Sequence, residues 1–384
     1  MLFEITCPSR IIFGPGTLER AVPDFASFGN RPLVVFGQNR ERGQAFLSSL
    51  ERAGHEVTLF QSYPEPTVDL ALAGVEKALA CRCDFIVGFG GGSVIDTGKA
   101  VSALLTNPGD PFEYLEVIGK GHPLSNQAAP YIAIPTTAGT GAEVTRNAVL
   151  ASPVHRVKVS LRSSKMFPRL AIVDPQLTYS LPPAVTASTG LDALTQVIEA
   201  FVSRKANPFT DLLCREGIRR AAQSLKRVFE RGDDTAARED MAITSLFSGL
   251  ALANAGLGAV HGLAGPLGGL IGAPHGEICA ALLPHVMRAN VETLSATGAS
   301  SSTLKRFDDL ATLLTGRDTA SADDAVRWIQ KLSEDLRVRP LSELGLTQET
   351  LAVTVENSLH ASSMKGNPAD LSKEALERIL QSAL

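Results

Sequence analysis

Residues 84–100 have the sequence DFIVGFGGGSVIDTGKA. The first part is apolar and predicts a buried strand, and the last part has the spacing of a helix that continues to residue 106. Glycines between a strand and a helix let the backbone approach an anion closely, and the helix N-terminus adds unpaired N–H groups. This turn therefore predicts a phosphate-binding site in an α/β domain, with a tight structural turn as the alternative.

Two common phosphate-binding motifs do not fit this turn. A P-loop ends in Gly-Lys-Ser/Thr, but here Lys99 is followed by Ala100. A GxGxxG dinucleotide motif opens the first strand–helix unit and ends on glycine, whereas residues 88–93 come later and end on Ser93. The motifs therefore argue against a nucleotide hydrolase and leave the kind of phosphate open.

Strand and helix patterns alternate on both sides of the turn, which predicts a parallel sheet with helices on both faces. Residues around 2–6 and 10–13 also have strand composition, and we expect them to form a small antiparallel flank. The other strands are expected at 32–37, 56–60, 84–89 and 130–134, and the helices at 41–54, 68–80 and 93–106.

The second half of the chain has a different pattern. From Pro182 onward the strand patterns stop and helical spacing continues to the end. We therefore expect an α/β N-terminal nucleotide-binding domain over 1–180 and an all-α C-terminal domain over 181–384. Helices are expected at about 184–203, 207–229, 235–255, 277–293, 302–315, 321–336, 347–359 and 373–382.

Composition restricts the class of protein. At about 100–200 residues per domain, the 384 residues predict two domains, and 44% hydrophobic and 20% charged residues exclude a disordered chain. A net charge of −4 argues against a nucleic-acid partner. Five scattered cysteines, the lack of a signal-peptide pattern and the repeated Gly, Pro and His in the low-charge stretch 242–287 predict a cytoplasmic protein with no membrane span.

A second polar loop, IPTTAGTGAEVT at 134–145, also follows a predicted strand. Thr136, Thr137 and Thr140 supply hydroxyl groups there. Because open α/β sheets bind ligands at the carboxyl ends of their strands, we expect both loops to face one crevice. An ordinary polar loop is the alternative.

The helical half contains a candidate metal site. Asp192 and Gln196 lie four residues apart in an apolar helical segment and so share one face. His261 and His275 lie in a stretch, 256–276, in which eight of 21 residues are glycine. A carboxylate with two imidazoles suits Fe(II) or Zn(II). Taken singly, the aspartate fits a cap or ion pair and the histidines fit a packed core. The other five histidines, His285 among them, are expected at the surface or in packing.

Together these motifs resemble the iron-containing (group III) alcohol dehydrogenase family. The resemblance spans nearly the whole chain, and several long motifs occur in the family's order. They are FGPG (13–16), GGGSVIDTGKA (90–100), PTTAGTGAEVT (135–145), VDPQLTYSLPP (173–183), GLDALTQVIEAF (190–201) and the paired His-Gly segments.

The resemblance implies a Rossmann-like nucleotide-binding domain, a helical metal domain and a site in the cleft between them. It also implies an oxidoreductase that acts on CH–OH groups by hydride transfer between a nicotinamide and a small alcohol or aldehyde, and a homodimer. Asp192, His261 and His275 match three metal ligands and would be the catalytic residues. The cofactor would be held by Gly91, Gly92, Ser93, Thr136, Thr137, Thr140, Asn147 and Lys158.

The chain departs from the family at two positions. Gln196 stands where the family has a histidine ligand, and Gly265 where many members have a histidine for proton relay. Three outcomes are open for the metal: three ligands completed by water, Gln196 as a weak fourth ligand, or loss of the metal. Without a histidine at 265, we expect the proton to leave through water or a ribose hydroxyl.

The sequence leaves both the choice of cofactor and the enzymatic function open. The position that usually carries a carboxylate for the ribose of NAD is Gly37, and Arg40 and Arg42 follow, which favours NADP(H) over NAD(H). A maleylacetate reductase-like, metal-independent enzyme is the nearest alternative function because of Gln196. A non-redox lyase similar to dehydroquinate synthase is a further one.

Overall fold

The computed structural model describes residues 2–63, 65–298 and 301–384 of the chain. The chain divides into two compact units. One contains Thr6–Thr137 and Gly141–Tyr179 and is called the sheet unit here. The other, the helical unit, contains Ser180–Leu384, the N-terminal residues through Ile5, and Ala138–Thr140.

The sheet unit is built on a six-stranded parallel sheet with the strand order β1-β8-β5-β4-β2-β3. The predicted antiparallel flank is wrong: Ile11 and its neighbours pair in parallel with the strand that starts at Leu170, and the described residues before them, 2–10, form no strand. The strands are β1 (Ile11–Phe13), β2 (Pro32–Phe36), β3 (Thr58–Gln61), β4 (Phe85–Gly90), β5 (Tyr131–Pro135) and β8 (Leu170–Val173).

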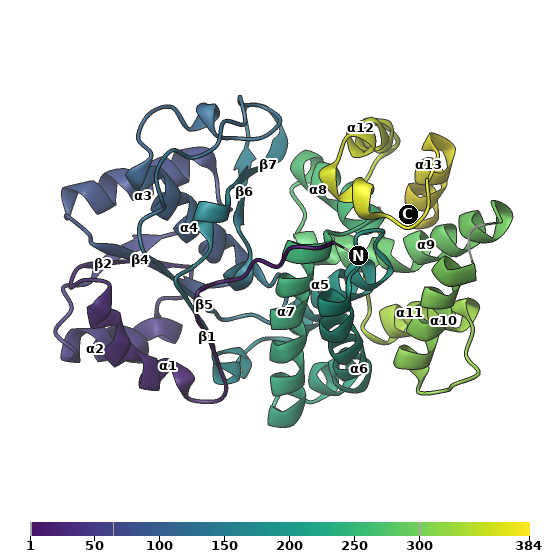
Figure 1. Ribbon diagram of the computed structural model, residues 1–384, viewed down its shortest axis with the longest axis horizontal. Coiled ribbons are helices and arrows are strands. Elements are labelled where there is room, and N and C mark those ends of the chain that lie inside the picture. The colour runs from purple at the N-terminus through teal and green to yellow at the C-terminus, as the bar shows by residue number, and fades with distance from the viewer. Residues whose placement is uncertain (1, 64, 299–300) are drawn as a thin grey trace. The chain divides into compact units, whose positions relative to one another are not determined.

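Helices cover both faces of this sheet (Figure 1). The reason is that successive side chains of β2 point to opposite faces of the sheet. Val34 packs with α1 and α2 in one apolar cluster, whereas Leu33 and Val35 pack with α3 and α4 in another. The helices are α1 (Thr17–Ala21), α2 (Gln44–Arg52), α3 (Val68–Ala80) and α4 (Gly92–Thr106).

An antiparallel hairpin, which the sequence did not predict, packs beside α4. It consists of β6 (Asn147–Ser152) and β7 (Val157–Arg162). The Val149 N–H donates to Asp96 of α4 at 3.1 Å, and alternate residues of β6 are buried. The hairpin carries Asn147 and Lys158, two of the expected cofactor residues.

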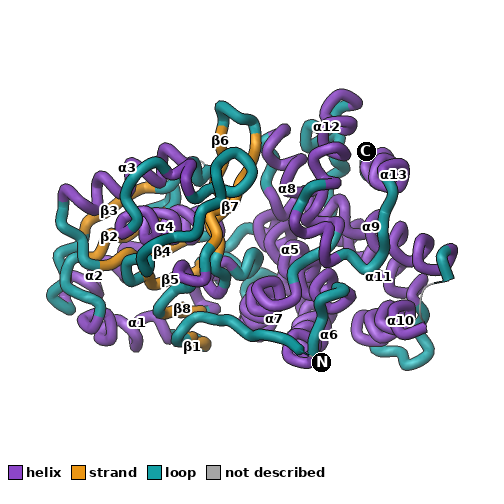
Figure 2. The backbone as a smooth tube through the Cα atoms, turned by 45° about the horizontal axis from the view of Figure 1, so that its top comes forward, coloured by secondary structure: helices purple, strands orange, loops and turns teal. Residues whose placement is uncertain are grey.

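The helical unit surrounds one large apolar core, to which α5 contributes most of its length (Figure 2). The α/β domain followed by an all-helical domain confirms the predicted fold class. One helix, over residues 259–271, was not predicted. The helices are α5 (Pro183–Val202), α6 (Pro208–Glu230), α7 (Thr235–Ala255), α8 (Ala259–Ile271), α9 (His275–Ala296), α10 (Ser301–Thr315), α11 (Ala322–Asp335), α12 (Gln348–Leu359) and α13 (Lys373–Ser382).

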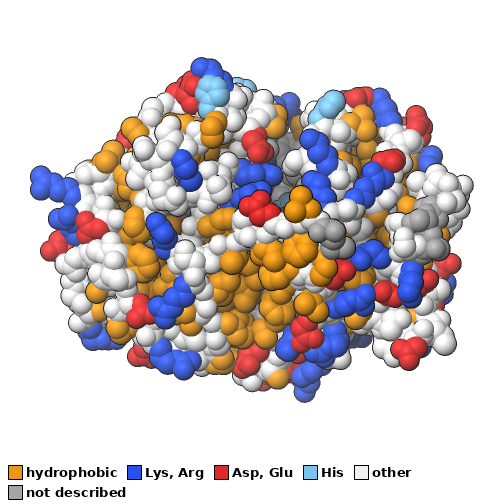
Figure 3. Space-filling view, viewed as in Figure 1, with side chains coloured by type: hydrophobic (Ala, Val, Ile, Leu, Met, Phe, Trp, Pro, Cys, Tyr) orange, Lys and Arg blue, Asp and Glu red, His pale blue; other side chains and the backbone are white. Residues whose placement is uncertain are grey.

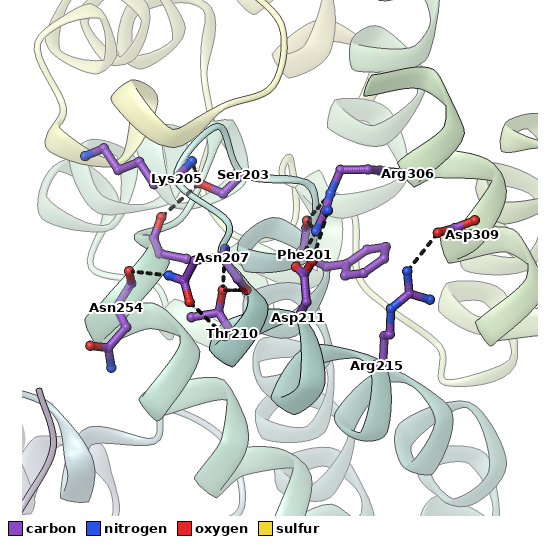
Figure 4. Close-up of polar contacts among 11 residues, drawn as sticks. Phe201, Ser203, Lys205, Asn207, Thr210, Asp211, Arg215, Asn254, Arg306 and Asp309 are labelled. Atoms are coloured by element: carbon purple, nitrogen blue, oxygen red, sulfur yellow. Dashed lines mark hydrogen bonds and ion pairs between the residues drawn. The ribbon is translucent and has the colours of Figure 1, made fainter. Parts of the chain in front are cut away.

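The end of α5 is fixed by polar contacts (Figure 4). Arg306 Nε of α10 donates to the Phe201 carbonyl at 2.8 Å, and Arg306 also pairs with Asp211. At the start of α6, Asn207 Oδ1 accepts from the Thr210 N–H at 3.2 Å, and the Thr210 hydroxyl accepts from the Asn207 N–H at 3.0 Å. These contacts hold in place the helix that carries the candidate metal ligands.

In the described part of the chain, no single helix is long and apolar enough to cross a membrane. Helices α7 and α8 pass such a test only as a pair, and they are bent by 98° at their junction. On the face shown in Figure 3, acidic and basic side chains lie around a broad area of hydrophobic side chains.

Candidate metal centre and nucleotide site

Helix α5 presents three polar side chains to the interior of the helical unit. Asp192, Gln196 and Glu199 follow one another at intervals of four and three residues, so they lie on one face of the helix. All three are buried, with exposed fractions of 1–3%. Buried polar groups in an apolar core require partners, and the partners here come from α7, α8 and α9.

Glu199 fixes the start of α8 and the orientation of His261. Its carboxylate accepts from the Val260 N–H at 2.7 Å and from His261 Nδ1 at 2.7 Å. A methyl group on Gly258 would lie 2.8 Å from Glu199 Oε1, so only glycine lets the carboxylate reach this helix end. The contact of Nδ1 with Glu199 fixes the ring so that Nε2 of His261 faces Asp192.

Three donor atoms converge on the Asp192 carboxylate. His261 Nε2 lies 3.3 Å and His275 Nε2 3.9 Å from Asp192 Oδ1. Cys279 Sγ lies 3.5 Å from His275 Nε2 and 3.8 Å from His261 Nε2. The four donor atoms all lie within 4.8 Å of one another. The structure thus brings together the three candidate ligands that the sequence indicated and adds a thiol.

The glycine at position 276 lets α9 pack closely against α5. A methyl group on Gly276 would lie 2.6 Å from the Ser188 carbonyl oxygen of α5, so a larger residue would push the two helices apart. His275 is the first residue of α9, and Cys279 follows one turn later on the same face.

The donor set fits a divalent metal ion. Asp192 Oδ1 is buried and, among the described residues, makes no hydrogen bond of acceptable geometry, although two imidazole nitrogens are close to it. Such an orphaned carboxylate oxygen is costly unless a cation or donor satisfies it. Burial alone would raise the pKa of Asp192, but the neighbouring His261 and His275 hold it below its usual value. The anionic form that a metal requires is therefore favoured.

Gln196 has other partners in the structure. Its Oε1 accepts from the Ser248 hydroxyl of α7 at 2.8 Å, and its side chain also hydrogen-bonds to Asp192. These two hydrogen bonds place the Gln196 side chain between Ser248 and Asp192, where it positions the Asp192 carboxylate.

Two residues of the site were missed by the sequence analysis. Glu199 lies seven residues after Asp192, so helical spacing already placed it on the same face. Cys279 lies four residues after His275, but it was treated as one of five scattered thiols. Burial opposes ionisation of Cys279, yet the adjacent His275 and His261 lower its pKa below the usual value.

The glycines in and around the turn between β4 and α4 have two different roles, one in packing and one at the start of the helix. Methyl groups on Gly88 and Gly98 would lie 2.2 Å and 2.7 Å from the buried Tyr131 side chain, so these glycines make room for that ring. A methyl group added to Gly91 would instead lie 3.4 Å from Thr137, and the backbone angles of Gly91 are ordinary. It precedes α4 without a side-chain cap, which leaves the first N–H groups of the helix for an anion.

Several expected cofactor residues lie around this turn. The Thr136 N–H donates to the Gly90 carbonyl at 2.9 Å, and a methyl group on Gly37 would lie 3.5 Å from Val94 of α4. Gly37, Gly91, Gly92, Ser93, Thr136 and Thr137 therefore cluster at the carboxyl ends of β2, β4 and β5, three adjacent strands. Thr140 groups with the helical unit instead.

The hairpin residues have protein partners. The Asn147 carbonyl accepts from Lys99 Nζ, and Lys158 Nζ pairs with Glu65 at 3.0 Å. Lys99 is fully buried and also donates to Ala142 O and Thr145 Oγ1, each at 2.9 Å. It therefore fixes the threonine loop, unlike a P-loop lysine, which binds phosphate.

Comparison with known proteins identifies the family. The model of the iron-containing alcohol dehydrogenases matches residues 8–175, and the model of the C-terminal domain of Fe-containing alcohol dehydrogenases matches residues 186–384. The chain belongs to the iron-containing alcohol dehydrogenase family. This confirms the resemblance seen in the motifs, and the chain is an oxidoreductase of the alcohol dehydrogenase type.

Relatives of known activity cover the whole chain. The 1,3-propanediol dehydrogenase of Klebsiella pneumoniae is 33% identical over 100% of this chain and 99% of its own. A crystal structure of a 1,3-propanediol oxidoreductase has a TM-score of 0.91 at 33% identity and covers 100% of both chains. A sulfoacetaldehyde reductase from Bifidobacterium kashiwanohense in complex with NAD+ has a TM-score of 0.87 at 29% identity, with 100% and 99% covered. These similarities favour the dehydrogenase function over the lyase alternative.

Proposed function

We propose that this iron-containing alcohol dehydrogenase family member is a divalent-metal-dependent, NADP(H)-preferring enzyme that interconverts a small alcohol and its aldehyde. The observation that carries the metal dependence is the orphaned Asp192 Oδ1 between the Nε2 atoms of His261 and His275. Asp192, His261 and His275 would hold the ion, either Fe(II) or Zn(II). We also propose that the functional division follows residues 1–180 and 181–384.

When bound, a divalent ion supplies Lewis acidity toward an alcohol or carbonyl oxygen. The protein side chains provide the rest. Glu199 holds His261 by Nδ1 so that Nε2 faces Asp192, and the Asp192 carboxylate supplies negative charge. The side chain of His275 is 38% exposed, so a small substrate can approach the cluster from that side. A methyl group on Gly265 would meet nothing within 4 Å, which leaves room for water to take the proton.

The glycine turn before α4 would hold the cofactor pyrophosphate, and hydride transfer itself belongs to the nicotinamide. Gly91, Gly92 and Ser93 would contact the phosphates, with Thr136, Thr137, Thr140, Asn147 and Lys158 lining the remaining cofactor site. The preference for NADP(H) rests on Gly37, which offers no carboxylate to a ribose 2′-hydroxyl, and on the exposed Arg40. Arg42 is less available because it donates to the Leu177 carbonyl at 2.9 Å.

Metal removal tests this function. Treatment of the purified protein with a chelator should abolish NADPH-dependent reduction of short aldehydes, because Asp192 and the two histidines alone supply no Lewis acid. Added Zn(II) or Fe(II) should restore it, and NADPH should give a higher kcat/KM than NADH. Activity that is indifferent to chelation, together with turnover of an unsaturated keto acid, would instead establish the maleylacetate reductase-like alternative.

The molecular context is part of the proposal. We propose a cytoplasmic homodimer that acts on small molecules and has no nucleic-acid or membrane partner. All five cysteines are free, which suits a reducing compartment. Sedimentation equilibrium of the purified protein measures the oligomeric state, and a monomer at micromolar concentration would contradict the dimer.

A further inference from the structure

Gln196, the candidate ligand one turn after Asp192 on α5, is engaged with the protein. Its carbonyl oxygen accepts from the Ser248 hydroxyl at 2.8 Å. Amide oxygens are also weak donors toward transition metals compared with imidazole or thiolate. The remaining donor atom near Asp192, His261 and His275 is Cys279 Sγ.

We propose that the Cys279 thiolate is the fourth protein ligand, so that Asp192, His261, His275 and Cys279 form a sulfur-containing site that selects zinc over iron(II). This inference rests on the proposed metal dependence. Cys279 is completely buried and reaches the cluster from the second turn of α9, one turn after His275. As the metal–sulfur bond forms, the thiol proton leaves to solvent.

The spacing of the donor atoms matches a tetrahedral zinc shell. Bonds of about 2.0–2.1 Å to nitrogen or oxygen and about 2.3 Å to sulfur, at tetrahedral angles, place N and O about 3.4 Å apart and N and S about 3.6 Å apart. The structure has 3.3 Å and 3.9 Å for the two N–O pairs. The two N–S pairs are 3.5 Å and 3.8 Å. These four distances fit one central ion, and all four donor atoms lie within 4.8 Å of one another.

A thiolate changes which metal the site prefers. Thiolate ligands are soft and favour Zn(II), whereas Fe(II) in open catalytic sites is typically held by imidazole and carboxylate. Four protein ligands would still permit catalysis, because a four-coordinate zinc site can accept a fifth ligand. The partly exposed His275 leaves one side of the cluster open for a substrate oxygen.

Cobalt substitution and X-ray absorption test the proposal. The wild-type protein loaded with Co(II) should show an intense near-ultraviolet thiolate-to-cobalt charge-transfer band. Extended X-ray absorption fine structure of the zinc form, which needs no variant, should show one sulfur at about 2.3 Å. Cys279→Ser should lose the band and weaken zinc binding by at least about 10-fold.

The matched control is Cys214→Ser. Cys214 is as buried as Cys279 and lies in the same apolar core, but it is absent from the donor cluster. This variant should retain both the band and the zinc affinity. Stoichiometric cobalt without a charge-transfer band, or a band that survives in Cys279→Ser, overturns the ligand role of Cys279 and leaves the proposed function intact. Failure of the wild-type protein to retain any divalent metal overturns both.

Discussion

At the scale of single residues, Glu143 is a buried acid that neither the metal nor the cofactor uses. It lies in the threonine loop near Lys99, and burial raises its pKa to about 7 from the usual 4.5. The folded state therefore holds a proton that the unfolded chain releases above pH 4.5. Consequently, the contribution of Glu143 to the free energy of unfolding should fall as the pH rises from 4.5 to about 7 and then level off.

Glu143→Gln should remove this dependence. The variant and the wild type should be equally stable at pH 4.5, and the variant should be more stable by roughly 3 kcal/mol above pH 7. Calorimetric unfolding across this pH range measures the difference. The control is Glu56→Gln, which removes an exposed carboxylate and should leave the pH dependence unchanged. A difference in stability between the variant and the wild type that does not grow between pH 4.5 and 7 would contradict the raised pKa.

At the scale of elements, the β4–α4 turn separates structural from functional glycines. Gly91→Ala should leave the fold intact, because the added methyl group makes only a 3.4 Å contact with Thr137. It should weaken NADPH binding by at least about 10-fold, because the methyl group blocks the close approach of the pyrophosphate. Fluorescence titration with NADPH and thermal unfolding of the same sample measure the two effects.

Gly88→Ala is the contrasting variant for the same turn. Its methyl group would lie 2.2 Å from Tyr131 Oη, whose hydroxyl donates to the Ile95 carbonyl at 2.8 Å. The ring cannot move without breaking this bond, so the variant should lose about 1–3 kcal/mol of stability. Normal cofactor affinity in Gly91→Ala would show that the phosphate binds elsewhere.

The same elements show what the sequence could and could not predict. Strands β2 to β5 and helices α2 to α4 were predictable because each has one clear period, and Asp192, His261 and His275 stood out by residue type. Helix α8 was not predictable from local propensity, since Pro266 and four glycines disfavour a helix. It forms because its apolar residues are buried and Glu199 binds its N-terminus, contacts that join residues about 60 positions apart.

Long-range contacts also explain the other differences. The direction of β1 depends on its pairing with β8, about 160 residues later, and nothing in residues 10–13 encodes it. The role of Cys279 was hidden for the same reason, because its proximity to Asp192 and His261 arises only when α5, α8 and α9 pack together. Residue type and spacing thus predicted ligands on single helices, whereas the complete donor set required the tertiary structure.

At the scale of the whole molecule, the metal ion and the nicotinamide cofactor should stabilise different units. All four metal-binding candidates belong to the helical unit, whereas Gly37, Gly91, Gly92 and the Thr136–Thr137 pair belong to the sheet unit. A ligand at 100 times its Kd stabilises the unit that binds it by about 2.7 kcal/mol. Amide hydrogen exchange should therefore slow by up to about 100-fold in the segments that open when that unit unfolds.

Peptide-resolved hydrogen exchange of the metal-free protein provides the measurement. Zn(II) should protect α5, α8 and the start of α9, and NADPH should protect β4, the first turn of α4 and the end of β5. In His261→Ala, which removes one imidazole, the protection by zinc should disappear while the protection by NADPH at β4 and α4 persists. Zinc-dependent protection confined to the sheet unit would show that the metal ligands are not Asp192, His261 and His275.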